Sequence, residues 1–405
     1  MKNKKLLTII LFILLLVSTI YSYSSANWEV DEIGRWVLMG KVNMITLGLN
    51  MLALCVTLWL AAHSLMRPRL RRVFSVVTPF FLFAVIFWTI LSVATGSLRN
   101  VIESAGSPIA YMAILGIYVG ADEECWRTVK RFAPIFAVIY LVMAYFPYQE
   151  MKSMMELQNV AGNNPITVFT ITAFWWVALS VVEIGNKSVY YKLFMLLLIA
   201  VCAFLAFSLT LRSWVIQSLL LLVVATWQMS RSKLLRVLVV AVVAIFLVKS
   251  VDRLWRSNQV ADEVESFDEK MMEDTRSNQY REFFDQVSAL QLFTGQGMEA
   301  GYMSTEGGMN YKYIDNQYLY ALFHYGALLT LPWLCFWLIA LLKRKESSVR
   351  IDGERSSMFI VIMWLMALGG LSVYNAVTIN PQNFVVALIA GRSLFLKFNR
   401  GSYAA

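Results

Sequence analysis

Long apolar runs recur along the whole chain, and they constrain its fold more than any other feature. A helix needs about 20 apolar residues to cross the hydrocarbon core of a bilayer. With 59% apolar and only 15% charged residues, the composition excludes an ordinary soluble domain. The sequence predicts an all-α, polytopic integral membrane protein with about 12 transmembrane helices in one domain, residues 1–405. The expected spans are 6–22, 42–62, 73–95, 101–120, 132–147, 166–183, 193–211, 213–229, 237–250, 316–342, 357–379 and 382–399.

Three of these spans are weaker than the others. The stretch 101–120 contains Glu103, 237–250 is short, and 382–399 contains Arg392. A charged side chain at the centre of a bilayer is costly, so these runs fit a membrane less well.

The distribution of lysine and arginine predicts the orientation, because these residues are retained on the cytoplasmic side of short loops. If the chain starts inside, the cytoplasmic segments hold 22 of them and the short external segments hold 5. Both termini are therefore expected in the cytoplasm. The net charge of +9 then reflects topology and does not indicate nucleic-acid binding. The basic start followed by the apolar run 6–22 also resembles a secretory signal. We expect this segment to remain as an uncleaved membrane anchor, and a cleaved signal is the alternative.

Cysteine and histidine usage gives no sign of a metal or redox site. Three of the four cysteines fall within predicted spans, and Cys125 lies in a predicted cytoplasmic loop. The two histidines, His63 and His324, both lie inside apolar runs. Because no group of these residues has the spacing of metal ligands, neither a metal nor a cofactor is expected.

Residues 251–313 form one long external segment that holds much of the polarity of the chain. Apolar residues recur in it at helical spacing from Tyr280 to Val287, while Arg281 and Asp285 share a polar face. The simplest interpretation is an amphipathic helix that lies on the outer membrane surface.

Arginines near this helix are candidates for binding an anion. Guanidinium groups bind phosphate with two parallel hydrogen bonds, and Arg281 together with Arg276 would suit a pyrophosphate. The alternative is that Arg281 only pairs with Asp285 at i+4, a weak contact when exposed.

A further arginine, Arg212, is the only charged residue between Lys192 and Arg231. Charges inside long apolar stretches usually face a cavity or mark a functional site, although a turn residue that reaches the membrane interface is the alternative. Gly295 and Gly297, in "GQG", predict a flexible turn after the amphipathic helix. Because no predicted strand precedes them, a nucleotide-binding loop is not expected.

The order of these motifs resembles a family. Arg281, "GQG", a variable loop and then "DNQYLYALFHYGALL" at the head of a span are similar to the C-terminal half of bacterial O-antigen polymerases and ligases, the Wzy-type glycan transferases. "AGNNP" at 161–165, which includes Asn164, and the Arg212–Ser213 pair between two spans agree with this resemblance. It covers roughly residues 148–342.

The resemblance implies a glycosyltransferase in the bacterial inner membrane. Such proteins act at its external face on oligosaccharides carried by undecaprenyl pyrophosphate, without a metal or a nucleotide sugar. The implied partners are this lipid-linked substrate, membrane lipids, and a chain-length regulator and a flippase of the same pathway. The product would be a surface polysaccharide such as O-antigen lipopolysaccharide, capsule or exopolysaccharide.

The resemblance also suggests roles for individual residues. Ligases typically carry a histidine at the position of Asp315, and its absence here favours a polymerase. Arg212 and Arg281 would stabilise the leaving pyrophosphate, and Asp315 is the expected general base, with Glu306 and Asp285 as rivals. Substrate-binding roles are expected for Arg276, Asn316, Gly295, Gly297 and Asn164.

Two alternatives remain open at this stage. Asp315 and Asn316 could simply cap the helix that follows them, because both residue types bind the free N–H groups of a helix start. At the level of the whole protein, an O-antigen ligase or a lipid-linked glycan transporter is the alternative to a polymerase.

Overall fold

The computed structural model describes residues 2–24, 27–30, 36–39, 44–65, 68–98, 101, 107–155, 165–185, 187–208, 212–229, 275–305, 308–342, 354–369 and 381–398. Most of these residues are helical. The elements are α1 (Lys2–Ser24), β1 (Asn27–Val30), β2 (Trp36–Met39), α2 (Met44–Leu65), α3 (Pro68–Phe74), α4 (Val77–Thr95), η1 (Pro108–Leu115), α6 (Gly116–Gly120), α7 (Glu123–Met155), α8 (Pro165–Val181), α9 (Val189–Ser208), α10 (Arg212–Met229), α13 (Thr275–Gln286), α14 (Ala289–Thr294), β3 (Tyr302–Ser304), β4 (Gly308–Tyr311), α15 (Gln317–Leu341), α16 (Glu354–Leu368) and α17 (Pro381–Phe398).

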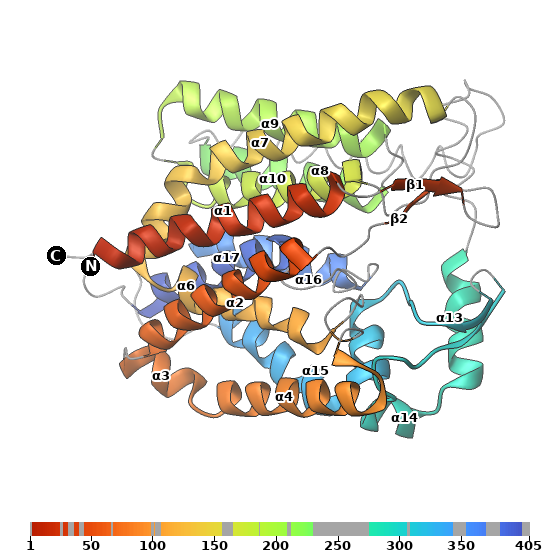
Figure 1. Cartoon of the computed structure of the whole chain (residues 1–405). Helices are drawn as coiled ribbons and strands as arrows, with labels where there is room; N and C mark the ends of the chain where they lie inside the picture. The colour runs from red at the N-terminus through yellow and green to blue at the C-terminus, as the bar shows by residue number, and fades with distance from the viewer. Residues whose placement is uncertain are drawn as a thin grey trace.

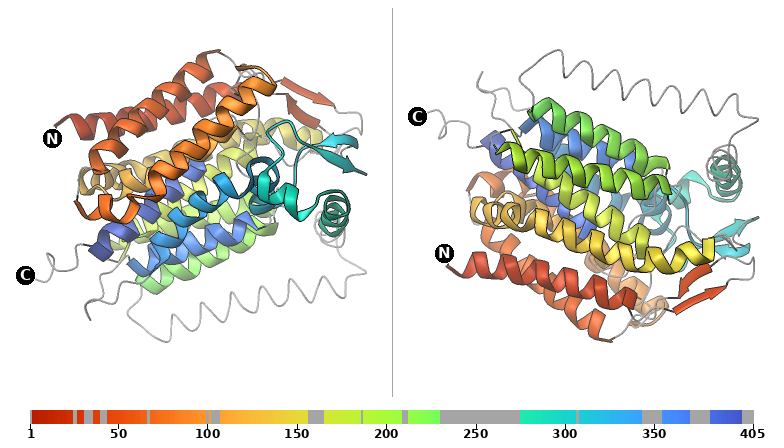
Figure 2. Two further views of the ribbon diagram at one scale, coloured as in Figure 1. Left: turned by 90° about the horizontal axis from the view of Figure 1, so that it is seen from below. Right: turned by 90° about the horizontal axis from the view of Figure 1, so that it is seen from above.

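Long apolar helices dominate the fold, as Figures 1 and 2 show. Among the described residues, six helices are long and apolar enough to cross a membrane: Asn3–Tyr21, Met44–Leu65, Val77–Thr95, Glu123–Phe146, Val189–Phe207 and Gln317–Leu341. Four shorter apolar helices accompany them: Pro108–Gly120, Ile166–Val181, Ser213–Met229 and Arg355–Leu368. The predicted helical, multi-pass membrane character is confirmed at this coarse level.

Several details differ from the prediction. The helix expected at 132–147 starts at Glu123, because a polar first turn with two acidic residues suits a helix N-terminus. The run expected at 101–120 forms a 3₁₀ segment followed by a short α-helix over 108–120. The span expected at 237–250 and the end of 357–379 lie outside the described residues.

The chain also contains strands that an all-α prediction does not include. β1 pairs with β2, and β3 pairs with β4, both antiparallel. These are short two-stranded ribbons, and the second one shows a register shift between Tyr302 and Ser304. Strands of three or four residues give too little alternation to stand out in a chain this apolar.

The bundle has two chemically different ends. Residues 275–305 and 308–316 form a small cap of helices α13 and α14 and the β3–β4 ribbon, which lies at the start of α15 (Figure 1). At the other end, Lys4 near the start of α1 pairs at 2.9 Å with Asp122, the residue directly before α7. The starts of these two helices therefore lie close together. We call these the cap end and the network end.

Helix α17 occupies the interior of the bundle (Figure 2). Every residue from Gln382 to Phe395 is buried, including Arg392 at 6% exposure. Arg392 is the residue that made this span a weak prediction. Its charge lies in the buried interior of the bundle, where an unpaired charge would be very unfavourable. It needs anionic partners.

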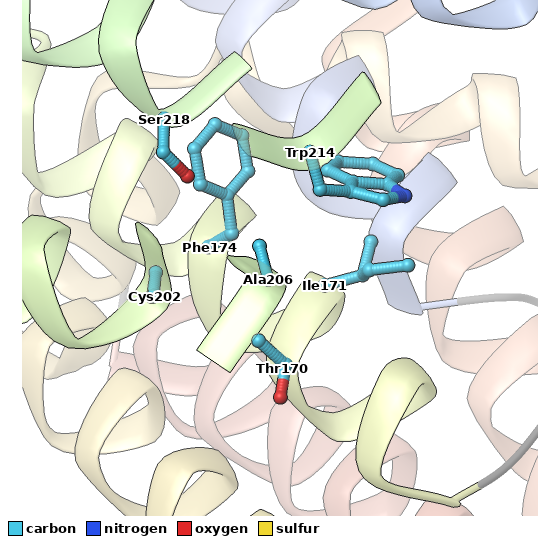
Figure 3. Close-up of a pocket in the computed structure, with 7 residues that line it drawn as sticks. All are labelled: Thr170, Ile171, Phe174, Cys202, Ala206, Trp214 and Ser218. Carbon is cyan, nitrogen blue, oxygen red and sulfur yellow. The ribbon is translucent and has the colours of Figure 1, made fainter. Parts of the chain in front are cut away.

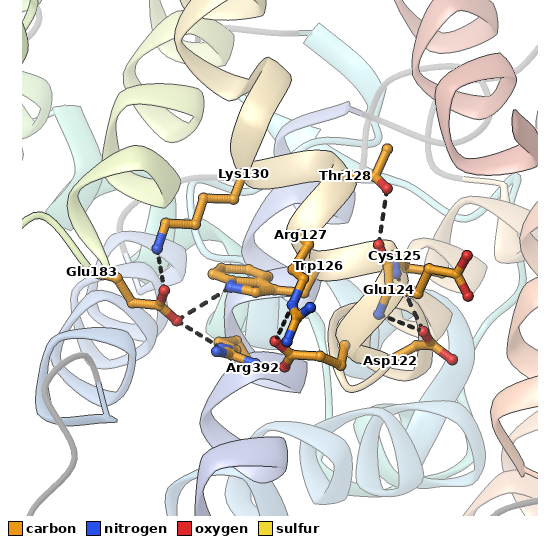
Figure 4. Close-up of polar contacts among 10 residues, drawn as sticks. Asp122, Glu124, Cys125, Trp126, Arg127, Thr128, Lys130, Glu183 and Arg392 are labelled. Carbon is orange, nitrogen blue, oxygen red and sulfur yellow. Dashed lines mark hydrogen bonds and ion pairs between the residues drawn. The ribbon is translucent and has the colours of Figure 1, made fainter. Parts of the chain in front are cut away.

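Arg392 finds these partners on two other segments (Figure 4). Its Nη1 lies 2.5 Å from Oε2 of Glu123, and its Nε lies 2.8 Å from Oε1 of Glu183. Glu183 also pairs with Lys130 and accepts a hydrogen bond from the Trp126 indole at 3.3 Å. This Arg392 network joins α17 to α7 and to the turn after α8, and the exposed Arg127 adds a further cation to Glu123.

The Arg392 network controls the ionisation of Glu183, which lies in the turn beyond the end of α8. Burial opposes its negative charge, but the cations of Arg392 and Lys130 outweigh that effect and hold the pKa of Glu183 below its ordinary value of 4.5. A carboxylate whose pKa is lowered in the folded state stabilises that state above the unfolded pKa. The contribution is lost as the pH falls through the folded value.

We expect the substitution Arg392→Met to lower the free energy of unfolding by about 3–5 kcal/mol, because it leaves two partly buried carboxylates without their shared cation. Thermal denaturation of the purified protein in detergent measures this effect. The matched control is Arg127→Ala, which removes a 74% exposed side chain from an i,i+4 pair with Glu123 and should cost at most about 1 kcal/mol.

The wild-type protein should also lose thermal stability as the pH falls below about 4.5, and Glu183→Gln should flatten that dependence. Equal denaturation temperatures for Arg392→Met and Arg127→Ala would contradict a stabilising network.

Candidate functional site

The cap is held on α15 by its own apolar cluster. Phe283, Val287, Tyr302 and Phe323 are all buried in it, and the Phe283 ring lies 5.2 Å from the rings of both Tyr302 and Phe323. The amphipathic helix expected in this region is present as α13. Phe283 on its apolar face and Val287 just after it are buried against the cap and α15, while Phe284 is 52% exposed, and the position of the helix on a membrane surface stays a prediction.

The polar pair at the head of α15 divides into two roles. Asn316 is the N-cap, and its side-chain oxygen accepts the backbone N–H groups of Tyr318 at 3.0 Å and Leu319 at 3.1 Å. Its amide nitrogen donates to the Gly369 carbonyl at 3.2 Å. The capping alternative therefore holds for Asn316, whose side chain is used within the fold. Asp315 lies one residue earlier and is exposed.

Helix α13 binds the backbone of Asp315 from both sides. The Asp315 N–H donates to the side-chain oxygen of Gln279 at 3.1 Å, and the Tyr280 hydroxyl donates to the Asp315 carbonyl at 3.1 Å. These two residues directly precede Arg281 in the sequence. The cap therefore brings together the part of α13 that contains Arg281 and the residue before the α15 cap.

The pairing of Arg281 with Asp285, the alternative to anion binding, is not formed. In the described part of the chain, Arg281 makes no ion pair with Asp285, and its Nη2 donates to the side-chain oxygen of Asn278 at 3.2 Å. Both Arg281 and Asp285 are exposed. The guanidinium thus lies on the surface of the cap beside a neutral amide.

Gly295 and Gly326 allow two backbones to meet. Gly326 has φ +60° and interrupts α15, and Gly295 has φ +80° at the end of α14. A Cβ on Gly295 would lie 2.6 Å from the Gly326 nitrogen, and one on Gly326 would lie 2.5 Å from the Thr294 carbonyl carbon. Such distances leave no room for a side chain at either position, which explains why glycine is required at both.

The "GQG" turn also supplies hydrogen bonds to the interrupted helix. The N–H groups of Gln296 and Gly297 donate to the carbonyls of Phe323 and His324, both at 2.8 Å. The N–H of Gly295 donates to Gln291 at 2.9 Å. These bonds occupy the backbone N–H groups of both glycines that the sequence suggested for substrate binding, so the turn has a structural role in the cap.

His324 is a residue that the sequence did not single out. Its ring is buried, and its Nδ1 and Nε2 lie 2.9 Å and 3.0 Å from the carbonyl oxygens of Gly297 and Lys312. Lys312 in turn pairs with Glu299, which lies in the same loop as Gly297. One side chain therefore connects α15 to the turn after α14 and to the segment that leads to Asp315.

Ionisable groups in the cap, Tyr302 and Glu282 among them, have shifted pKa values. Burial raises the pKa of Tyr302, and the negative potential of Tyr311, Glu282 and Asp315 adds to the shift, so its hydroxyl stays protonated and donates to Tyr313. A hydrogen bond from the Thr305 hydroxyl is the main cause that lowers the pKa of Glu282. Both groups are used in holding the cap together.

The remaining predicted residues are less fully described. Arg212 is the first residue of α10, and Arg276 is the second residue of α13. The structure describes nothing of their side chains. Asn164 and Glu306 lie outside the described residues.

The position of Arg212 along the bundle follows from hydrogen bonds of its neighbours. Gln217 donates to the Met363 carbonyl at 3.2 Å, and Tyr318 donates to the Leu365 carbonyl at 2.6 Å. Both contacts reach the last turns of α16. The starts of α10 and α15 therefore lie at the same end, which places Arg212 at the cap end.

A small hollow in the bundle lies between α8, α9 and α10 (Figure 3). It has room for little more than a single water molecule. Its lining is mostly apolar, and none of the predicted site residues is part of it: Thr170, Ile171, Phe174, Cys202, Ala206, Trp214 and Ser218. It is a packing gap among helices and is separate from the cap.

Comparison with models of known protein families and with curated proteins finds no match to the chain. Among the described residues, no group of three or more histidine, cysteine or acidic side chains could hold a metal ion. The candidate site therefore rests on the geometry of the cap and on the resemblance of its motifs.

Substituting His324→Phe should release the turn at 295–297 from α15. Phenylalanine keeps the ring but has no nitrogen to bond the part-buried carbonyls of Gly297 and Lys312, and the loss of such a contact costs about 1–3 kcal/mol. Hydrogen–deuterium exchange followed by mass spectrometry should show faster exchange at the amides of Gln296 and Gly297.

The control is His63→Phe, the same change at the other histidine, which is exposed and stacks on Trp59 in α2. It should leave exchange in the cap unchanged. Exchange at 295–297 that is equal in the two variants would show that His324 does not hold the turn.

Proposed function

We propose that the protein polymerises a surface glycan, transferring the growing chain from undecaprenyl pyrophosphate to the next lipid-linked repeat unit. The observation that carries the proposal is the docking of α13 on residue 315. Gln279 and Tyr280 bind the backbone of Asp315, so the turn of α13 that contains Arg281 is held next to the head of a long apolar helix. The order of motifs that resembles the Wzy-type transferases agrees with it.

In the proposed reaction Asp315 and Arg281 have separate roles. The acceptor sugar hydroxyl attacks the anomeric carbon of the donor glycan, and a new C–O glycosidic bond forms as the bond to the pyrophosphate oxygen breaks. The hydroxyl proton passes to the carboxylate of Asp315. The electron pair of the broken bond leaves with the pyrophosphate, and Arg281 stabilises its growing negative charge.

Arg212 is the second cation of the proposal. It opens α10 at the cap end, where it can approach a pyrophosphate that enters from the membrane. Arginine suits this task, because its guanidinium stays charged at a low-dielectric boundary and binds two phosphate oxygens at once.

The lipid-linked substrate also sets the location of the reaction. The cap end would face the outer side of the bacterial inner membrane, with both termini in the cytoplasm. A flippase would deliver the repeat units to that side, and a chain-length regulator would limit the product. The distribution of lysine and arginine between the loops supports this orientation.

Reconstitution of the purified protein with a lipid-linked repeat unit tests the proposal. Ladders of longer lipid-linked chains are expected on a gel for the wild-type protein. Arg281→Ala should slow elongation by about 10²–10³-fold, because a donor that stabilises the leaving charge is lost. Asp315→Asn should slow it by about 10²–10⁴-fold, the usual contribution of a general base.

Arg127→Ala provides the matched control, since it removes an exposed arginine at the network end. It should elongate at the wild-type rate. Absence of elongation by the wild-type protein on all lipid-linked units tried, or undiminished elongation by Arg281→Ala and Asp315→Asn, would overturn the proposed function.

A further inference from the structure

The exposed apolar side chains of α14 do not suit a cap that faces water. None of its residues is buried, and Leu290 and Phe293 are 71% and 67% exposed. The segment from Gln286 to Met298 contains no charged residue. Large exposed apolar side chains without flanking charge usually mark a surface that contacts something else.

The depth of α14 can be measured along α15. The carbonyl oxygen of Phe293 lies 2.6 Å from the position of a Cβ on Gly326. Gly326 comes nine residues after Gln317, where α15 starts, which is about 13 Å along a helix. From Gly326 to Leu341 the helix rises only about 22 Å, which is less than the roughly 30 Å of a hydrocarbon core. The backbone of Phe293 is therefore level with the interior of the apolar layer.

Helix α4 gives an independent measure of the same depth. A Cβ on Gly295 would lie 2.8 Å from the Trp88 ring. Trp88 comes seven residues before α4 ends at Thr95, about 10 Å from that end. The neighbouring Phe87 and the more distant Phe83 are exposed on α4. The apolar side chains of α14 thus continue the outward surface of a helix long and apolar enough to span a membrane.

Non-helical backbone at this depth is tolerated only when its polar groups are satisfied within the protein. The turn meets that condition, because Gln296 and Gly297 donate to carbonyls of α15 and Gly295 donates to Gln291. At the start of α14, Ser288 and Gln291 form a capping box that satisfies further N–H groups. The segment can therefore enter a bilayer at little cost from its backbone.

We infer that residues 289–297 form a wedge that enters the lipid layer beside α4, with Leu290 and Phe293 in contact with acyl chains. The occupant of this surface is the bilayer itself. Helix α13, whose Phe283 is buried against protein, is not part of the wedge. The inference is independent of the proposed reaction, because it concerns only the surface of the folded chain.

Spin labelling tests the wedge in the full-length protein. Cys55 and Cys335, the two cysteines that are not fully buried, are first replaced by alanine. Single cysteines are then introduced by Leu290→Cys and Phe293→Cys, labelled with a nitroxide and studied in phosphatidylcholine and phosphatidylglycerol vesicles. Collision with oxygen, which dissolves in lipid, is compared with collision with a water-soluble nickel chelate.

Two reference sites calibrate this comparison. Phe83→Cys places a label on the exposed face of α4, and Asp285→Cys places one on the exposed polar face of α13. Labels at 290 and 293 are expected to match the one at 83, with frequent oxygen collisions and few nickel collisions. A match to the label at 285 would overturn the wedge, and so would exclusion of both reagents, which would show that protein covers the surface.

A second measurement covers variants that label poorly. Maleimide–polyethylene glycol reacts only with thiols that reach water. In intact vesicles it should modify the cysteine at 285 and spare those at 290 and 293 until detergent is added. Equal modification of all three cysteines before detergent would contradict the inference.

Discussion

The interruption of α15 at Gly326 is the constraint on which the cap depends. A helix that long would normally satisfy its own backbone, but the φ of +60° at Gly326 leaves carbonyls before it that need donors. The turn after α14 supplies them through Gln296 and Gly297, and it can approach because Gly295 has no side chain. These hydrogen bonds between the turn and α15 hold the cap in its position on the bundle. His324 then fixes the same turn through its ring.

The two ends of the bundle solve the problem of polar groups near a membrane in different ways. At the network end, Arg392 is buried and is matched by the carboxylates of Glu123 and Glu183, so its charges are neutralised inside the fold. At the cap end, Arg281 stays exposed and has a neutral amide as its partner. A matched charge holds helices together, whereas an exposed guanidinium can still bind an anion. This difference is why the cap end, and not the more highly charged network end, is the better candidate for chemistry.

Sequence patterns predicted the parts of this structure that depend on hydrophobicity. Runs such as 73–95 and 316–342 correspond closely to α4 and α15, since length and apolar content determine such helices locally. The apolar face of α13 was also predictable, but its burial against Phe323 was not, because the partner lies some 40 residues away in the chain. The roles of His324 and Gly295 depend on the same long-range contact. Only the rarity of histidine in the chain could have drawn attention to His324.

The Asp315–Asn316 pair shows how the fold separates two roles that the sequence could not. Both residue types cap helices, but a helix has one N-cap, and Asn316 occupies it. Asp315 is bound through its backbone by Gln279 and Tyr280, so its side chain is not needed to start the helix. An acidic residue that is fixed in position and yet exposed is suited to accept a proton from a ligand. If α14 enters the lipid as inferred, the wedge and this carboxylate lie at the same end of the bundle.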